Sequence, residues 1–133
     1  MSEMVDDDMI KEFLTDAHDY LESIELDLLA MERDGIQTSA EIINRIFRAI
    51  HSVKGSAGFL GLTPVMGFSH TMESLFAKVR DGSLSLEPEL VDVLLAGVDK
   101  LRLMFDDHPN CGNVPVSEEL AVLNRYLGIS LHP

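Results

Sequence analysis

The residue best suited to chemistry in this chain is His51, within the segment Ala-Ile-His-Ser-Val-Lys-Gly-Ser-Ala-Gly-Phe-Leu-Gly at positions 49–61. Three of the ten basic residues, Arg45, Arg48 and Lys54, lie within six positions of it, although the formal net charge is −13. A neutral imidazole whose orientation is fixed by a neighbour is a nucleophile. Because nearby cations stabilise developing negative charge, the segment indicates phosphoryl transfer onto His51.

Glu73 and His70 are the predicted neighbours of His51. A connection at 61–62 separates two predicted helices, with His51 about ten residues before it and His70 and Glu73 about ten residues after it. In an antiparallel pair joined by a tight turn, such residues lie at similar heights. We expect Glu73 to accept a hydrogen bond from one nitrogen of His51, which leaves the other nitrogen free toward solvent. The alternative is that Glu73 pairs with Lys78 or with nothing.

Apolar residues that recur at three- and four-residue steps predict four substantial helices and a short fifth one. The expected ranges are about 7–32, 40–60, 64–80, 88–105 and 118–127. Thr63 and Ser117 are expected to cap the third and the last helix. The stretch 106–110 is expected to close the fourth helix, and a polar loop should follow it to Ser117. No long segment alternates as a strand does. The fold class is all-α: an antiparallel up-down-up-down four-helix bundle with an additional short C-terminal fifth helix.

The predicted helix over 40–60 places His51 on its solvent side. Gly35 is expected to end the preceding helix, and Thr38 or Ser39 to cap this one. Its expected buried stripe is Ile43, Ile46, Ile50, Val53 and Ala57. The opposite, exposed row is Asn44, Arg48, His51 and Gly55. This spacing follows from the helical repeat, and a glycine on the exposed row lets another protein approach closely.

The composition excludes several functional classes. The acidic balance does not supply the basic stripe that nucleic-acid binding requires. Cys111 is the single cysteine, so no internal disulfide forms, and we interpret it as a structural thiol. The N-terminal segment is acidic and no apolar run reaches membrane-spanning length. We therefore expect a cytoplasmic protein with no membrane insertion.

The segment His51-Ser52-Val53-Lys54-Gly55-Ser56-Ala57, followed by Gly58-Phe59-Leu60-Gly61-Leu62, resembles the signature of histidine phosphotransfer (HPt) domains. Within that family the resemblance is closest to the N-terminal phosphotransfer domains of CheA chemotaxis sensor kinases. Two further segments are similar to them, Phe13-Leu14-Thr15-Asp16-Ala17-His18-Asp19-Tyr20-Leu21 and His70-Thr71-Met72-Glu73-Ser74-Leu75. The likeness covers about residues 8–127. It implies a single domain over 1–133 that is an N-terminal fragment of a longer kinase.

The resemblance also implies roles for five residues. His51 would be the phosphoacceptor, and Glu73 would orient and polarise its ring. His70 would assist the hydrogen-bond network, Lys54 would stabilise the phosphoryl group, and Gly55 would permit close approach of a partner. These five positions match the family's pattern.

The resemblance further implies two kinds of partner, a kinase ATP-binding domain and chemotaxis-type response-regulator receiver domains. The chain contains neither a glycine-rich nucleotide loop nor an Asp-x-Gly-x-Gly element, so no cofactor is expected on it. Mg-ATP would be bound by the kinase domain, which would phosphorylate His51 in trans. The resemblance also allows a location at membrane receptor arrays, where the full-length kinase would hold this domain.

Three other hypotheses remain open from the sequence. A stand-alone HPt protein of a multistep phosphorelay would use the same site but a receiver aspartyl phosphate as donor. A metal-binding bundle would use His51, His70 and Glu73 as a set of two histidines and one carboxylate. A purely structural helical adaptor would leave His51 as an ordinary surface residue.

Overall fold

A computed structural model describes residues 7–34 and 40–128 of the protein. Its helices are α1 (Asp7–Asp34), α2 (Ala40–Leu60), α3 (Thr63–Arg80), α4 (Pro88–Asp106), the 3₁₀ helix η1 (His108–Asn113) and α5 (Ser117–Tyr126). Within the described ranges there is no strand, which confirms the predicted all-α class. The predicted signals at Gly35, Thr38 and Ser39 lie outside the described residues.

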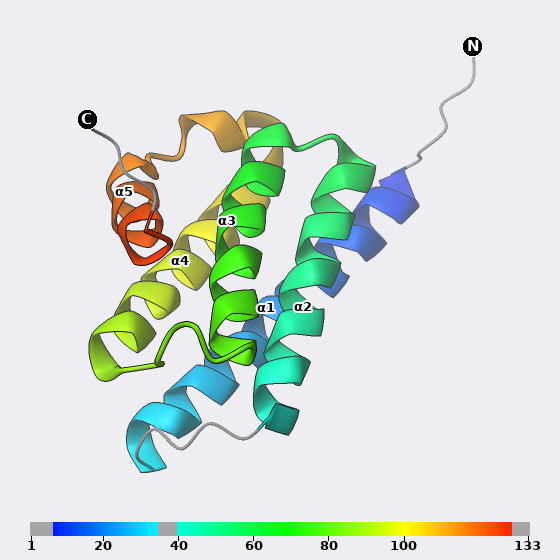
Figure 1. Ribbon diagram of the computed structural model, residues 1–133. Coiled ribbons are helices and arrows are strands. Elements are labelled where there is room, and N and C mark those ends of the chain that lie inside the picture. Colours follow the sequence, from blue (N-terminus) through cyan, green and yellow to red (C-terminus); the bar gives the residue numbers. More distant parts are fainter. Residues whose placement is uncertain (1–6, 35–39, 129–133) are drawn as a thin grey trace.

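The first four helices run alternately up and down and close into a ring (Figure 1). α1 packs on α2 and α4, and α3 packs on the same two helices from the other side. The short α5 lies against α3 and α4 and makes no contact with α2 (Figure 1). This is the predicted four-helix bundle with an appended fifth helix.

The bundle is held together by one apolar core to which all four long helices contribute. α2 buries the predicted stripe of Ile43, Ile46, Ile50, Val53 and Ala57. Each fully buried large apolar side chain contributes about 1.5–3 kcal/mol relative to its exposed state. The helical repeat therefore fixes which face of α2 points inward and leaves the row of His51 outside.

A tight turn sets the register between α2 and α3. Gly61 has a φ of +73°, a left-handed conformation that only glycine adopts at little cost. The amides of Gly61 and Leu62 donate to the carbonyls of Gly58 and Ala57 at 3.2 and 2.9 Å, and Leu62 is buried. Because α2 ends in this closed turn, residues equidistant from it meet across the two helices.

The structure corrects the predicted capping residues. Thr63 and Ser117 are themselves the first helical residues of α3 and α5, and neither helix has a side-chain cap hydrogen bond. The residues before them, Leu62 and Val116, are apolar and pack against the core. Because Leu62 and Val116 pack against the core at the cap positions, each polar residue lies one step inside its helix.

The segment predicted to close the fourth helix over 106–110 and to continue as a polar loop to Ser117 is partly helical. Residues His108–Asn113 form η1, and Cys111 within it is buried. Short 3₁₀ turns lack the apolar periodicity that identifies a longer helix, which is why the sequence did not indicate this one. The burial of Cys111 agrees with a structural thiol.

Candidate functional site

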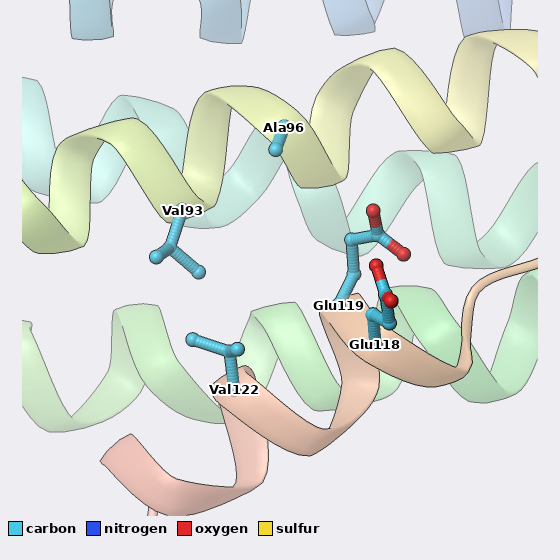
Figure 2. A pocket seen from close by; sticks show the side chains of 5 residues that line it. All are labelled: Val93, Ala96, Glu118, Glu119 and Val122. Carbon is cyan, nitrogen blue, oxygen red and sulfur yellow. The ribbon is translucent and has the colours of Figure 1, made fainter.

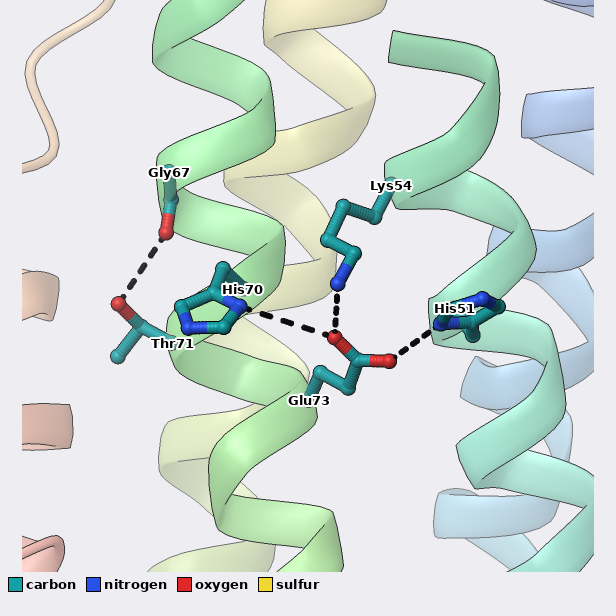
Figure 3. A network of polar contacts seen from close by, with 6 residues as sticks. All are labelled: His51, Lys54, Gly67, His70, Thr71 and Glu73. Atoms are coloured by element: carbon teal, nitrogen blue, oxygen red, sulfur yellow. Dashed lines mark hydrogen bonds and ion pairs between the residues drawn. The ribbon is translucent and has the colours of Figure 1, made fainter. Parts of the chain in front are cut away.

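The carboxylate of Glu73 on α3 is the centre of a polar network at the α2–α3 interface (Figure 3). Its Oε2 atom lies 2.5 Å from Nδ1 of His51, and its Oε1 atom accepts a hydrogen bond from Nζ of Lys54 at 2.6 Å. Both partners come from α2, one turn apart. The predicted contact between His51 and Glu73 is therefore present, and the alternative pairing with Lys78 is not: Lys78 donates to the carbonyl of Leu127.

The electrostatics of Glu73 favour its ionised form. Burial by itself raises the pKa of this carboxyl, but hydrogen bonds from Lys54 and His51, together with the positive charge of Lys54, outweigh that effect and leave the pKa below its ordinary value. An ionised carboxylate only accepts hydrogen bonds, so Nδ1 of His51 carries the proton that it shares with Glu73.

The ring of His51 is consequently held in one tautomer with its second nitrogen exposed. The side chain of His51 is 64% exposed while that of Glu73 is 11% exposed. The Nε2 atom points away from Glu73 (Figure 3) and keeps its lone pair. An oriented neutral imidazole of this kind can act as a nucleophile toward an electrophile that arrives from solvent.

His70 lies one turn before Glu73 on α3, and the structure gives it a weaker contact than the sequence suggested. Its Nδ1 atom is 3.8 Å from Oε1 of Glu73, which is longer than a hydrogen bond. The interaction is therefore a charge attraction that exists only while His70 is protonated. Its side chain is largely exposed, so it lies at the edge of the network rather than within it.

Gly55 continues the exposed row of α2 one turn beyond His51. A Cβ atom at this position would have no atom within 4 Å, so no internal packing requires a glycine there. The absence of a side chain therefore lowers the surface beside the imidazole. This fits the expected role in close approach, which remains a prediction.

The three cations near His51 in the sequence do not form one cluster in the fold. Arg45 faces α1, where its Nη2 and Nε atoms donate to the two carboxylate oxygens of Asp27 at 2.7 and 3.0 Å. Lys54 faces Glu73, and only Arg48 shares the exposed row with His51. Arg45 is therefore not part of the site, because its position on the helix points it to a different neighbour.

The metal-site hypothesis gains no support from this geometry. Among the described residues, no three His, Cys, Asp or Glu side chains lie close enough together to hold a metal ion. The ammonium of Lys54 also contacts the Glu73 oxygen nearest His70, where it would repel a cation.

None of the helices in the described residues has the length and apolar character that a membrane-spanning segment needs.

A hollow elsewhere on the surface lacks comparable chemistry. It lies between α4 and α5, and Figure 2 shows the side chains that line it: Val93, Ala96, Glu118, Glu119 and Val122. Apolar groups form most of the lining, and no histidine or basic residue is among the residues that line it. The candidate site around His51, by contrast, presents its ring on an exposed helix face, which suits a reaction with another protein.

The Hpt domain family matches residues 8–104 of the chain. The chain is 30% identical over 135 residues to the chemotaxis protein CheA of Treponema pallidum, a match that covers 98% of the chain and 16% of that protein. It is 32% identical over 103 residues to CheA of Salmonella typhimurium, with 77% of the chain and 15% of that protein covered. The chain therefore spans about a sixth of the length of these relatives.

Solved structures show the same fold. The phosphorylated P1 domain of CheA3 from R. sphaeroides, solved in complex with CheY6, matches with a TM-score of 0.76 and 28% identity over 92% of this chain and 95% of that one. The CheA phosphotransferase domain from Thermotoga maritima matches with a TM-score of 0.69 and 30% identity over 77% of this chain and 96% of that one. On the family match, these relatives and the shared bundle, the chain belongs to the Hpt domain family, and its relatives are the phosphotransfer domains of CheA.

Proposed function

We propose that this chain is the phosphoacceptor and phosphotransfer module of a chemotaxis histidine kinase, with His51 as the phosphorylated residue. The observation that carries the proposal is the contact of Nδ1 of His51 with a buried, ionised Glu73, which directs Nε2 to solvent. The similarity to CheA phosphotransfer domains supports the same assignment. Residues 1–133 would then be one domain of a longer kinase.

In the first half-reaction, Nε2 of His51 attacks the γ-phosphorus of ATP held by the kinase's ATP-binding domain. The new N–P bond forms as the bond between the γ-phosphorus and its bridging oxygen breaks, and ADP leaves. Nδ1 keeps its proton, so the phosphorylated ring is positively charged while Nδ1 donates its hydrogen bond to Glu73. The carboxylate stabilises this charge, as an aspartate does beside the imidazolium of a hydrolytic triad.

In the second half-reaction, a receiver-domain aspartate attacks the same phosphorus atom. The N–P bond breaks, its electrons return to Nε2, and His51 is again neutral with its proton on Nδ1. No proton moves in either direction through Glu73. The domain therefore needs only positioning and electrostatics, while Mg-ATP and its binding residues are supplied by the kinase domain.

The partners in this proposal are the kinase ATP-binding domain and chemotaxis-type receiver domains. The crystallised complex of the R. sphaeroides P1 domain with CheY6 supports a receiver as the phosphoryl acceptor. Because the proposed reaction consumes ATP, which is a cytoplasmic nucleotide, we assign the domain to the cytoplasm. In this proposal His70 lies at the edge of the network, 3.8 Å from Glu73, and Lys54 keeps Glu73 ionised. Gly55 lowers the surface on which a partner would dock.

The test is to incubate the chain with the ATP-binding domain of a CheA kinase and Mg-ATP labelled on the γ-phosphorus. We expect label that is lost in acid and stable in base, that maps to Nε2 of His51 by nitrogen-15 NMR, and that passes to an added receiver domain. Omitting the kinase domain is the control and should leave the chain unlabelled. Label on another residue, or no label, would contradict the proposal.

The same assay separates the kinase module from a stand-alone phosphorelay protein. A kinase module accepts phosphate from the ATP-binding domain faster than from a phosphorylated receiver. A stand-alone protein has the reverse preference. The likeness to CheA over most of the chain supports the first of these.

A further inference from the structure

Arg48 is the one cation near His51 that has no carboxylate partner in the described part of the chain. Arg45 is held by two hydrogen bonds to Asp27, and Lys54 is held by Glu73 at 2.6 Å. The side chain of Arg48 is exposed and forms neither an ion pair nor a hydrogen bond with any described residue. The fold therefore commits two of the three neighbouring positive charges to structure and leaves one available.

The charges of the neighbouring groups leave Arg48 as the uncompensated one. Lys54 and Glu73 compensate each other, and His51 meets the carboxylate through Nδ1, so that Nε2 faces solvent. The chain as a whole carries a net charge of −13, which repels anionic groups at long range. Arg48 thus supplies the uncompensated positive charge one turn from His51.

Helix geometry brings Arg48 and His51 together. They are three residues apart on the exposed row of α2, a spacing at which side chains are neighbours. Side chains on a helix lean toward its N-terminus, so the ring of His51 inclines toward the turn that carries Arg48. Lys54 lies on the C-terminal side of His51 and reaches Glu73 instead (Figure 3).

From this arrangement we propose that Arg48 binds the phosphoryl group as it moves on and off Nε2 of His51. A guanidinium donates two parallel hydrogen bonds to phosphate oxygens and stays protonated throughout, so the atom balance of the two half-reactions is unchanged. Its charge also attracts the anionic donor to an otherwise repulsive surface. This inference rests on the proposed function and adds a phosphoryl-binding residue that lies outside the network of Glu73.

The experiment compares Arg48→Gln, Arg48→Lys and Arg45→Gln with the parent chain. Arg45→Gln is the matched control, because it removes the same charge three residues earlier from the side of α2 that faces α1. Phosphorylation rates are measured at low and high salt with two donors: the kinase domain with Mg-ATP, and phosphoramidate. Phosphoramidate is a small phosphodonor that has no protein surface to dock.

We expect Arg48→Gln to lower kcat/KM about tenfold at low salt with both donors and to weaken the salt dependence for the kinase domain. Arg48→Lys should keep the salt dependence but recover only part of kcat, since an ammonium cannot form the bidentate contact. Arg45→Gln should lose stability and keep its transfer rates. The melting temperature of Arg48→Gln should equal that of the parent chain.

Three outcomes would overturn the inference while the proposed function stands. These are unchanged rates in Arg48→Gln, an equal loss in Arg45→Gln, and a loss with the kinase domain alone, which would place Arg48 on the protein partner rather than on the phosphoryl group. If the parent chain is labelled by neither donor, the proposed function itself fails and this inference fails with it.

Discussion

His51 contacts Glu73 across the α2–α3 interface, and His18 contacts Asp106 across the α1–α4 interface. In the first pair the ring is 64% exposed and the carboxylate 11% exposed. In the second pair the ring is 32% exposed and the carboxylate 61% exposed. Each pair joins an imidazole to a carboxylate, but the less exposed member is the carboxylate in the first pair and the imidazole in the second.

The two pairs also differ in which ring nitrogen of the histidine contacts the carboxylate, and therefore in which nitrogen is left for chemistry. In the first pair Nδ1 of His51 faces the carboxylate, so Nε2 faces solvent. In the second pair Nε2 of His18 is itself the contacting atom, at 3.1 Å, and the ring packs edge-on against Phe105 with centroids 6.2 Å apart. The two contacts therefore leave different ring nitrogens exposed, and only the arrangement at His51 combines a buried carboxylate with an exposed Nε2, as the proposed acceptor requires.

The largest effect is expected from replacing the two histidines. His51→Gln should abolish phosphorylation by the kinase domain, because the amide has no nucleophilic ring nitrogen. His18→Gln should leave the phosphorylation rate unchanged, since its outer nitrogen is occupied and it lies on another interface. Both variants are tested by incorporation of acid-labile phosphate. Loss of labelling in His18→Gln at intact fold would remove the distinction between the two pairs.

Replacing the carboxylates should give the next largest effect. Glu73→Ala should slow phosphorylation about 10²-fold by releasing the tautomer and the charge stabilisation of His51. Because Glu73 is buried, the same change should lower the free energy of unfolding by about 1.5–3 kcal/mol through the lost charged hydrogen bonds. Single-turnover kinetics and urea unfolding measure the two quantities.

The matched control is Asp106→Ala, which removes an exposed carboxylate from the other pair. It should leave the transfer rate unchanged and alter stability by less than about 1 kcal/mol, as exposed ion pairs do. An equal slowing in both variants would show that net charge, and not the anchored carboxylate, controls the reaction.

The lowered pKa of Glu73 predicts how acid acts on the first pair. Because the folded-state pKa lies below the unfolded one, the stabilisation is fully present above the ordinary glutamate value of about 4.3 and is lost as the pH falls through the folded pKa. The difference in unfolding free energy between the parent chain and Glu73→Gln should therefore be constant near neutrality and shrink in acid. A difference that grew in acid would reverse the assigned sign.

Much of this site follows from the sequence because its geometry is local to one turn. The glycine at 61 closes α2 onto α3, so counting outward from it places His51 opposite Glu73. Arg45 is nine residues from Lys54 and hence about half a turn around α2 from it, at roughly 100° per residue. Proximity in sequence did not separate these two faces.

Burial depth and short turns lie beyond the periodic pattern. The near-complete burial of Glu73 depends on how closely two helices pack, and no single helix's sequence encodes that. The periodic pattern also gave no sign of η1, because its six residues show no repeat. Nor did it show that buried Leu62 takes the cap position of α3, which therefore begins at Thr63. The resemblance to HPt domains supplied residue roles, whereas helix phasing supplied positions.

The smallest expected effect is on stability, and it comes from replacing two glycines, one beside His51 and one in the core. Gly55 lies beside His51 with no atom within 4 Å of an added Cβ, whereas at Gly97 in α4 the added atom would lie 2.9 Å from Sδ of the buried Met72. Gly55→Ala should therefore stabilise the fold by about 0.5–1 kcal/mol through helix propensity. Gly97→Ala should gain less or lose stability, since overpacking costs about 1–3 kcal/mol.

Urea unfolding tests this pair of glycines, and phosphotransfer assays sharpen it. Gly55→Gln, which adds a long neutral side chain next to the ring, should slow transfer from the kinase domain and to a receiver while leaving phosphorylation by phosphoramidate unchanged. Such a result assigns Gly55 to docking, because a small donor needs no room above α2. If Gly55→Ala instead destabilised the bundle, the glycine would be required for folding. Its lack of a side chain could then not be assigned to the docking of a partner protein.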